Sequence, residues 1–242
     1  MDSIRGMASL PTAPLAVAAG PRDPATAARK ARFWDRIARQ YAADPIADMA
    51  GYEATLQRVL SFLNPGHDVL EIGCGTGTTA LRLAPFTRRL LATDVSQEMI
   101  HIARDKLAAR PLPQLSFAVA DADAQVFGQG IYDAVLAFNM LHLVSDLDRA
   151  LAQAVRALRP GGLLISKTPC ISEMNPLVRW LMRWPMLPLM RAIGKAPDVL
   201  LCFDAAQLQI AMARQGLHIE AVERHGTRGK DFRVFIVARK PD

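Results

Sequence analysis

The chain has 242 residues, of which 51% are hydrophobic and 21% are charged, a composition typical of a globular enzyme with one α/β domain. The formal net charge is +6 at pH 7, but the basic residues are scattered with few aromatic residues among them, which disfavours a nucleic-acid partner. Cys74, Cys170 and Cys202 are far apart and form no CxxC pair, which disfavours a disulfide framework and a metal site.

The chain begins with an alanine- and proline-rich stretch. Residues 1–24 lack a strongly basic start, and Pro11 and Pro14 interrupt the apolar run, so we expect a flexible tail instead of a secretory signal peptide. The chain contains no apolar stretch of 18 residues, so no membrane-spanning helix is predicted. Together with reduced cysteines, these features predict a cytoplasmic protein.

Two N-terminal cap helices are predicted within residues 25–64, at 25–43 and 50–63. Apolar residues recur at helical spacing in the first helix, and a proline-containing turn follows each helix. We expect these helices to belong to a single domain that covers residues 25–242.

From residue 65 onward, short apolar runs alternate with amphipathic stretches of helical length. The predicted strands are 69–72, 89–94, 115–120, 132–138 and 163–168, and the predicted helices are 78–83, 97–109 and 147–158. Strands separated by helices form right-handed crossovers, so we expect an α/β fold with a mostly parallel, Rossmann-like sheet and helices on both faces. After a helix at 205–214, the β-like runs 217–223 and 232–239 are joined by a short link and therefore pair antiparallel.

A glycine-rich loop lies between the first predicted strand and the next helix. The loop reads Glu71-Ile72-Gly73-Cys74-Gly75-Thr76-Gly77, and Asp94 ends the following strand 21 positions after Gly73. Glycines allow a ligand to approach the backbone closely, and a carboxylate about 20 residues away accepts hydrogen bonds from ribose hydroxyls. This combination predicts a nucleotide-binding site.

The details of the loop separate the candidate ligands. Gly77 follows the second glycine by two residues, whereas a dinucleotide-binding loop carries its third glycine one residue later. Glu71 would repel a pyrophosphate but suits a cationic group, such as an amino or sulfonium group. No Walker lysine follows the loop. The predicted ligand is therefore a nucleoside that carries positive charge.

Four motifs together resemble those of class I S-adenosylmethionine-dependent methyltransferases. They are Val69-Leu70-Glu71-Ile72-Gly73-Cys74-Gly75-Thr76-Gly77, Ala92-Thr93-Asp94-Val95-Ser96, Ala120-Asp121-Ala122 and Leu158-Arg159-Pro160-Gly161-Gly162. The resemblance covers about Phe33 to Lys240 and is to the small-molecule branch, methyltransferase type 11, which includes ubiquinone- and menaquinone-pathway enzymes and bacterial phospholipid N-methyltransferases. It implies S-adenosylmethionine as the cofactor and a seven-stranded sheet with an antiparallel last strand, in agreement with the predicted C-terminal hairpin.

The resemblance also implies a set of residues around the cofactor. The expected contacts are Glu71, Gly73, Cys74, Gly75 and Gly77 with the methionine part, Asp94 with the ribose, Val95, Asp121 and Ala122 with the adenine, and Phe138 and Asn139 beneath the cofactor. Asp123 is an alternative to Asp121, which is preferred because it ends a strand. Tyr41 matches a position whose hydroxyl reaches the methionine carboxylate, although a half-buried packing role explains this tyrosine equally well.

His142 is the candidate base. Methyl transfer from a sulfonium mainly requires that the acceptor is placed close to the methyl group and that water is excluded. A base is needed only for an acceptor that loses a proton, and His142 follows Phe138 by four residues at the carboxyl end of a strand. A packing or turn-capping role is an equal alternative for this histidine.

Residues 172–203 are expected to select the methyl acceptor. Within them, the stretch 177–193 is rich in leucine, methionine and tryptophan and contains three arginines. This pattern favours a lid over an apolar or amphipathic small-molecule or lipid acceptor, and peripheral membrane contact is a second interpretation. The identity of the acceptor, the methylated atom and the oligomeric state do not follow from the sequence.

Other functions fit only part of the pattern. A catalytically silent S-adenosylmethionine-binding module is compatible with it, because the acceptor half carries no fingerprint. An NAD-type oxidoreductase is disfavoured by the loop spacing and by Glu71. A nucleic-acid amino-methylating enzyme is disfavoured because Phe138-Asn139-Met140-Leu141 stands where that group has an Asn/Asp-Pro-Pro-aromatic motif.

Overall fold

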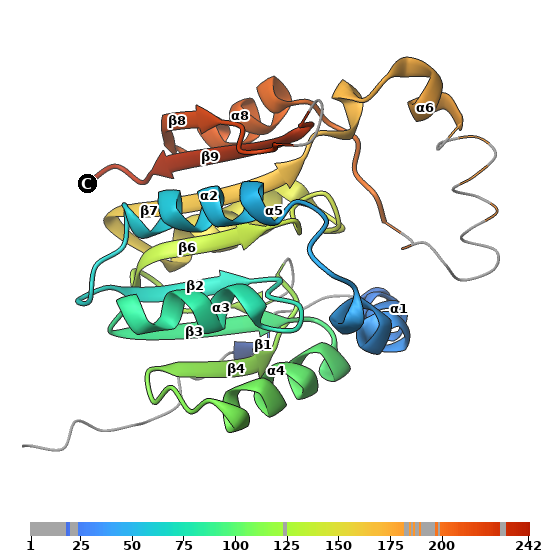
Figure 1. Cartoon of the computed structure of the whole chain (residues 1–242). Helices are drawn as coiled ribbons and strands as arrows, with labels where there is room; N and C mark the ends of the chain where they lie inside the picture. The colour runs from blue at the N-terminus through green and yellow to red at the C-terminus, as the bar shows by residue number, and fades with distance from the viewer. Residues whose placement is uncertain are drawn as a thin grey trace, which may run out of the picture.

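A seven-stranded sheet forms the centre of the molecule, with helices on both faces (Figure 1). The structure is a computed structural model that describes residues 18–19, 24–122, 125–181, 184, 186, 189, 197, 199–227 and 231–242. The strands are β2 (Asp68–Ile72), β3 (Arg89–Asp94), β4 (Leu115–Val119), β6 (Tyr132–Phe138), β7 (Leu158–Pro169), β8 (His218–Glu223) and β9 (Arg233–Arg239). Their order is β4-β3-β2-β6-β7-β9-β8, and β9 is antiparallel to both neighbours while the other pairs are parallel. The predicted fold class is confirmed, including its C-terminal hairpin.

Helices on the two faces divide the core into two layers. The helices α2 (Met49–Leu60), α3 (Thr78–Leu83) and α4 (Gln97–Ala109) cover one face, and α5 (Leu147–Ala157) and α8 (Ala205–Arg214) cover the other. Successive strand residues alternate between the layers, since Val69 packs with residues of α2 and Leu70 packs with residues of α5. Strands buried on both faces account for the nearly continuous apolar runs in the sequence.

The remaining helices lie near the carboxyl ends of the parallel strands. Figure 1 shows α1 (Pro24–Ala43) beside these ends and α6 (Pro176–Leu181) further out, and two short 3-10 turns cover Ala84–Phe86 and Ile171–Glu173. None of the helices in the described ranges is both long and apolar enough to cross a membrane.

Two features differ from the expectation. The strand β7 begins at Leu158 instead of residue 163, because Tyr132 pairs with Leu158 before a register shift brings Ala134 opposite Leu163. A second, two-stranded sheet joins β1 (Ala18–Ala19) and β5 (Gln125–Val126), which are too short to show a period in the sequence.

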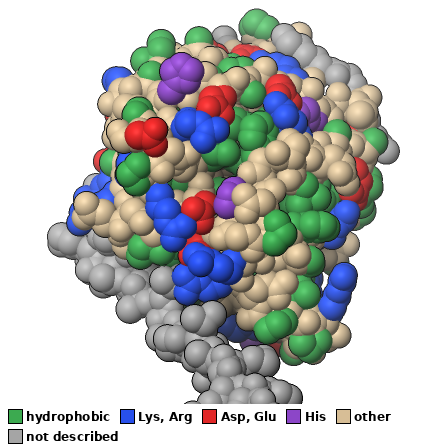
Figure 2. Space-filling view, turned by 90° about the vertical axis from the view of Figure 1, so that its left-hand side faces the viewer, with side chains coloured by type: hydrophobic (Ala, Val, Ile, Leu, Met, Phe, Trp, Pro, Cys, Tyr) green, Lys and Arg blue, Asp and Glu red, His purple; other side chains and the backbone are tan. Residues whose placement is uncertain are grey.

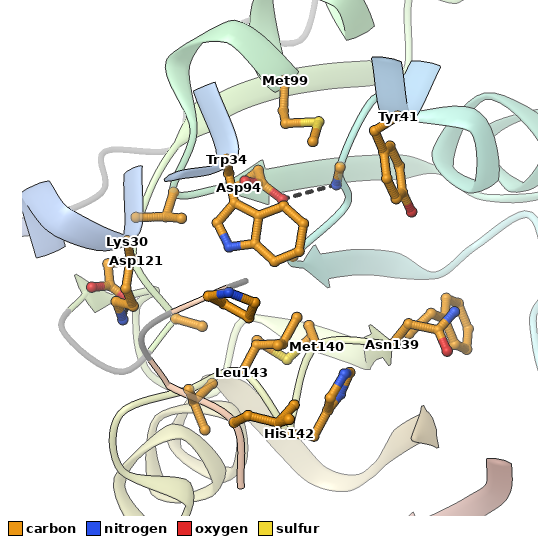
Figure 3. A pocket seen from close by; sticks show the side chains of 18 of the residues that line it. Lys30, Trp34, Tyr41, Asp94, Met99, Asp121, Asn139, Met140, His142 and Leu143 are labelled. Carbon is orange, nitrogen blue, oxygen red and sulfur yellow. Dashed lines mark hydrogen bonds and ion pairs between the residues drawn. The ribbon is translucent and has the colours of Figure 1, made fainter. Parts of the chain in front are cut away.

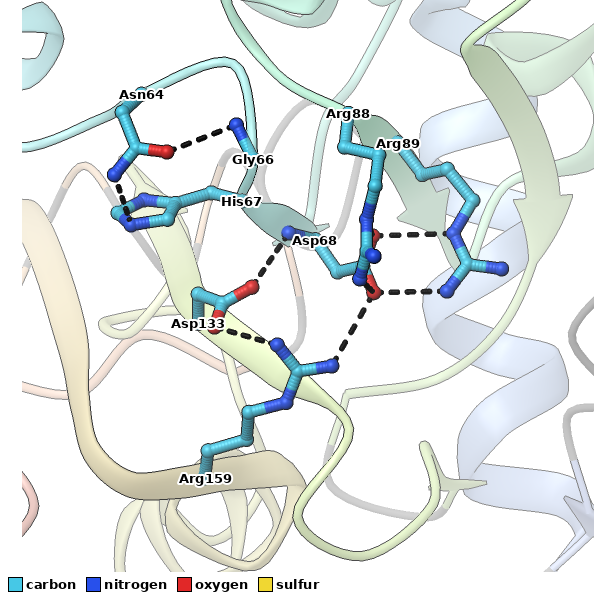
Figure 4. A network of polar contacts seen from close by, with 8 residues as sticks. All are labelled: Asn64, Gly66, His67, Asp68, Arg88, Arg89, Asp133 and Arg159. Atoms are coloured by element: carbon cyan, nitrogen blue, oxygen red, sulfur yellow. Dashed lines mark hydrogen bonds and ion pairs between the residues drawn. The ribbon is translucent and has the colours of Figure 1, made fainter.

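A polar network joins the strand starts at the opposite end of the sheet (Figure 4). The buried Asp68 accepts hydrogen bonds from Arg88 Nε at 2.8 Å, from Arg89 Nη2 at 2.8 Å and from Arg159 Nη2 at 3.3 Å, while Asp133 binds the Asp68 backbone N–H and Arg159. Burial raises the pKa of Asp68, but the hydrogen bonds from Arg89 and Arg88 outweigh it and hold that pKa below its usual value. Figure 2 shows basic and acidic side chains next to one another on this side of the molecule.

Candidate active site

Two cavities adjoin each other at the carboxyl ends of β2, β3 and β6, where sheets of this kind bind ligands. The first cavity (Figure 3) has a volume of ≈ 400 Å³ and the second ≈ 330 Å³. Tyr41, Phe138 and Asn139 contribute to the walls of both. A ligand in the first cavity therefore has a neighbouring space within reach of these three residues.

The first cavity brings together ten of the predicted site residues. They are Tyr41, Gly73, Gly75, Asp94, Val95, Asp121, Ala122, Phe138, Asn139 and His142. Cys74 lines the second cavity, whereas Glu71 and Gly77 line neither of the two. Asp123, the alternative to Asp121, lies outside the described residues.

The glycine loop needs its glycines for two different reasons. Gly73, Gly75 and Gly77 have φ angles of +68°, +54° and +73°, which other residues rarely adopt. A Cβ at Gly73 would lie 2.6 Å from Met140 Cβ, and one at Gly77 would lie 2.6 Å from Phe117 Cζ, so these two positions permit close packing. At Gly75 the nearest atom would be 3.6 Å away, so this part of the loop is open toward the cavity.

The loop and β3 hold Asp94 in a fixed orientation. Asp94 Oδ2 accepts a hydrogen bond from Gly75 N at 2.9 Å, and Oδ1 accepts one from Ser96 N at 2.9 Å. Each carboxylate oxygen has a further lone pair that a ligand hydroxyl can use. Burial raises the pKa of Asp94, although these backbone N–H groups oppose the effect.

Glu71 is a buried carboxylate whose hydrogen-bonding capacity is only partly satisfied. It is 2% exposed, and its Oε2 has no hydrogen-bond partner among the described residues. Burial, followed by the charge of Asp94, raises the pKa of Glu71 to about 8. Burial also raises the pKa of Tyr41, with further contributions from Asp94 and Glu71, so its hydroxyl stays protonated near the two carboxylates. A cationic ligand group would complete this arrangement, and the α-amino and sulfonium groups of S-adenosylmethionine fit that requirement.

Sequence reasoning missed two residues of α1 that line the first cavity. Lys30 and Trp34 share a face of the helix with Tyr41, and their spacing of four and seven residues was the available signal. Figure 3 shows Trp34 beside Asp94 and Lys30 beside Asp121, with Lys30 Nζ 2.7 Å from Asp121 Oδ1. The carboxylate at the predicted adenine end therefore also holds α1.

His142 lies in an apolar part of the first cavity. Figure 3 shows it near Met140 and Leu143, and its buried Nδ1 has no hydrogen-bond partner among the described residues. Burial lowers the pKa of His142 to about 4. The imidazole is therefore neutral at pH 7 and has a lone pair free to accept a proton.

Part of the predicted lid segment contacts the cavity. Pro197 and Leu200 line it, and Leu201 N donates a hydrogen bond to His142 O at 2.8 Å. In contrast, the described apolar side chains of Leu177, Trp180, Trp184 and Leu189 are each more than half exposed. Residues 182–183, 185, 187–188, 190–196 and 198 lie outside the described part of the chain.

Comparison with known proteins identifies the central part of the chain. Residues 69–162 match the family model described as "Methyltransferase domain". A demethylmenaquinone methyltransferase from Beutenbergia cavernae is 31% identical over 137 residues, which are 55% of this chain and 55% of that protein. The methyltransferase GfsG from Streptomyces halstedii is 31% identical over 150 residues, which are 59% of this chain and 54% of that protein. The chain thus spans about half the length of these curated relatives.

Solved structures share the fold. An S-adenosylmethionine-dependent methyltransferase from Mesorhizobium loti superposes with a TM-score of 0.66 at 23% identity, covering 79% of this chain and 98% of that one. A phosphoethanolamine N-methyltransferase from Haemonchus contortus, in complex with S-adenosyl-L-methionine, has a TM-score of 0.65 at 18% identity, covering 79% of this chain and 53% of that one. Residues 69–162 therefore match a methyltransferase domain, and the sheet that contains them has the same fold as these solved methyltransferase structures.

Proposed function

We propose that this protein transfers a methyl group from S-adenosylmethionine to an apolar or amphipathic small-molecule or lipid acceptor. The observation that carries the proposal is the first cavity, which is lined both by Asp94, a carboxylate suited to a ribose, and by an apolar wall around His142 (Figure 3). S-adenosylmethionine, when bound, supplies a methyl group on a sulfonium that is already activated for displacement. The protein must then orient the two reactants and exclude water.

On the cofactor side, each polar residue would contact a different part of S-adenosylmethionine. Asp94 would accept the ribose hydroxyls, and Glu71 would neutralise the amino group beneath the loop. The Tyr41 hydroxyl would donate to the methionine carboxylate. Asp121 would accept from the adenine amino group and share its carboxylate with Lys30, to which it is paired in the structure.

On the acceptor side, the wall is apolar. Met140, Leu143, Val144 and Leu200 line the cavity around His142. Such a wall favours an acceptor with a hydrophobic body and keeps water away from the reacting atoms. The neutral His142 is our proposed base for an acceptor that must lose a proton.

The exposed apolar side chains of the segment 177–193 support a peripheral membrane contact. Trp180 and Trp184 are amphipathic and exposed, and side chains of this kind are favoured at the membrane–water interface. A lipid acceptor could then pass from the membrane to the cavity. All three cysteines are free thiols, which suits the reducing cytoplasm.

Calorimetric titration of the full chain separates this function from its alternatives. S-adenosylmethionine and S-adenosylhomocysteine are expected to bind saturably, while NAD is not. Release of S-adenosylhomocysteine would then be measured with a panel of quinols, phospholipids and small amines. Binding of NAD alone would indicate an oxidoreductase, and cofactor binding without turnover on any acceptor would indicate a silent module.

A further inference from the structure

The second cavity differs in character from the first. The lining includes the hydroxyls of Tyr52, Thr55 and Thr79 and the cationic groups of Lys167 and Arg233. Apolar side chains, among them Pro45, Ile46 and Leu56, also line it. Tyr41 and Cys74, two of the predicted contacts with the methionine part of the cofactor, border this space, but the groups around Lys167 have no assigned ligand.

Lys167 connects this space to the centre of the site. It lies near the end of β7, opposite Phe138 in the neighbouring strand, and its carbonyl accepts a hydrogen bond from Asn139 N at 2.7 Å. Because Asn139 borders both cavities, a group bound at Lys167 is held next to the place where the methyl group would be transferred.

The ammonium group of Lys167 is buried with few partners. The residue is 6% exposed, and Nζ donates to Thr55 Oγ1 at 2.7 Å and, over a long 3.4 Å, to Gly51 O. In the part of the chain that the structure describes, no carboxylate lies within 4.0 Å of Nζ. Lysine is rarely buried unless it is paired, and an ammonium has three N–H donors. A ligand that accepts a hydrogen bond and carries negative charge would compensate this group.

Two carboxylates, Asp44 and Asp48, also line the second cavity, and Asp48 and Arg233 are engaged with other partners. Asp48 accepts hydrogen bonds from Gly51 N at 3.0 Å and from Thr227 Oγ1 at 2.6 Å, and Asp231 Oδ1 accepts one from Arg233 Nε at 3.0 Å. Burial lowers the pKa of Lys167 and Arg233 adds to this effect, while Asp231 and Asp48 oppose it. These carboxylates moderate the charge of the site without forming the missing contact to Nζ.

A chain of hydrogen bonds holds Lys167 in place. Thr55 Oγ1 lies 3.1 Å from His225 Nδ1, and His225 Nε2 lies 3.0 Å from Glu223 Oε2. Arg58 binds the same Glu223 from α2. Thr55 therefore acts as a positioning residue that is itself oriented from β8 and the residues that follow it, so Nζ has little freedom to leave the cavity.

We propose that the second cavity binds an oxyanion group, a carboxylate or a phosphate, of the methyl acceptor, with Lys167 as its principal ligand. The acceptor is then an amphipathic acid whose charged group lies at Lys167 and whose reacting atom lies over Asn139. This inference rests on the proposed methyltransferase function and narrows its substrate class. It disfavours acceptors whose only charged group at this end is an amine, because the ammonium groups would repel each other.

The test is calorimetric titration of the full chain saturated with S-adenosylhomocysteine. The probes are octanoate, octyl phosphate and octylamine, with acetate as a short acid. Octanoate or octyl phosphate is expected to bind at least about tenfold more tightly than octylamine, and the tighter of the two identifies the oxyanion. Octanoate is expected to bind more tightly than acetate because its chain contacts the apolar wall of the cavity.

Variants locate the binding. Lys167→Met is expected to weaken binding of the preferred acid at least about tenfold, and Thr55→Val to weaken it less. Lys240→Met is the matched control, since Lys240 Nζ also donates to two oxygens, the carbonyls of Val155 and Leu158, but far from the cavity. Thermal unfolding would establish that each variant is folded. Lys167→Arg, which keeps the charge, is expected to retain part of the affinity and serves if the methionine variant does not fold.

The possible outcomes are distinct. Unchanged affinity in folded Lys167→Met, octylamine binding as tightly as the acids, or no binding of either acid would overturn the inference. Equal affinity for acetate and octanoate would indicate a site that binds any small anion, and this result would also contradict the inference. The initial titration with S-adenosylhomocysteine tests the proposed function separately. If S-adenosylhomocysteine does not bind, the affinities of the wild type and of Lys167→Met for the two acids can still be compared in the cofactor-free protein.

Discussion

Replacing Glu71 with glutamine should stabilise the cofactor-free protein and weaken cofactor binding at the same time. The carboxylate is 2% exposed, its Oε2 lacks a hydrogen-bond partner among the described residues, and Asp94 adds a second negative charge nearby. Glutamine keeps the size of the side chain but cannot ionise. The variant should therefore have a higher free energy of unfolding, and it should lack the carboxylate that pairs with a cationic ligand group.

The size of the effect follows from the pKa of Glu71. Burial and Asp94 raise this pKa from 4.5 to about 8 in the folded protein. Because the folded-state value lies above the unfolded value, the folded state binds more protons between them, and stability falls as the pH rises from about 4.5 to about 8. At pH 7 the side chain is largely protonated in the folded protein but ionised in the unfolded chain. Because pH 7 lies about 2.5 units above the unfolded pKa, this difference reduces the free energy of unfolding by about 3 kcal/mol.

Urea unfolding followed by tryptophan fluorescence measures this prediction. The free energy of unfolding of Glu71→Gln minus that of the wild type should be small near pH 4.5 and rise to about 3 kcal/mol at pH 7. Glu53→Gln is the control, because Glu53 lies in α2 at the surface and pairs with Arg82, and its difference should change little over this range. A difference for Glu71→Gln that is independent of pH would refute the reasoning.

Cofactor affinity gives the second half of the test. A buried cation next to Glu71 would stabilise the carboxylate, so S-adenosylhomocysteine should bind Glu71→Gln about tenfold or more weakly than the wild type. Binding to the wild type should also release protons near pH 7, which calorimetry in buffers of different ionisation enthalpy detects. Equal affinity in the two proteins would mean that Glu71 does not face the amino group.

Three further predictions concern other parts of the molecule. Asp94→Ala should weaken S-adenosylhomocysteine binding by about 1–3 kcal/mol in calorimetry, because a charged acceptor is lost; unchanged affinity would exclude Asp94 as the ribose ligand. Asp68→Asn should lower the free energy of unfolding by about 1–3 kcal/mol in urea while leaving cofactor affinity unchanged, since its arginine partners lie at the far end of the sheet. His142→Gln should lower kcat about a hundredfold or more for an acceptor that loses a proton. Because the pKa of His142 is lowered to about 4, the wild-type pH–rate profile should show no histidine ionisation between about pH 5 and 8. An ionisation in this range that is present in the wild type and absent in His142→Gln would contradict the lowered pKa.

The sequence by itself determined the order and type of almost every element of the central sheet. Strands buried on both faces read as apolar runs, and the helices between them carry their own capping and stop signals, so these features are local in the chain. The glycine loop and Asp94 were also predictable, because one crossover places them side by side: Gly75 N binds Asp94 across 19 positions of sequence. The short pair β1 and β5 had no such local signal.

Only the tertiary structure decided what surrounds this loop. Lys30 meets Asp121 across 91 positions, and Lys167 meets Thr55 across 112, and neither pair has a spacing that a sequence pattern could show. The burial that raises the pKa of Glu71 and lowers that of Lys167 likewise arises from elements that are distant in the chain. Desolvation depends on everything packed around a group, whereas periodicity and turns depend on its neighbours in sequence. For this reason the contact between the glycine loop and Asp94 could be predicted from the sequence, and the cavity around Lys167 could not.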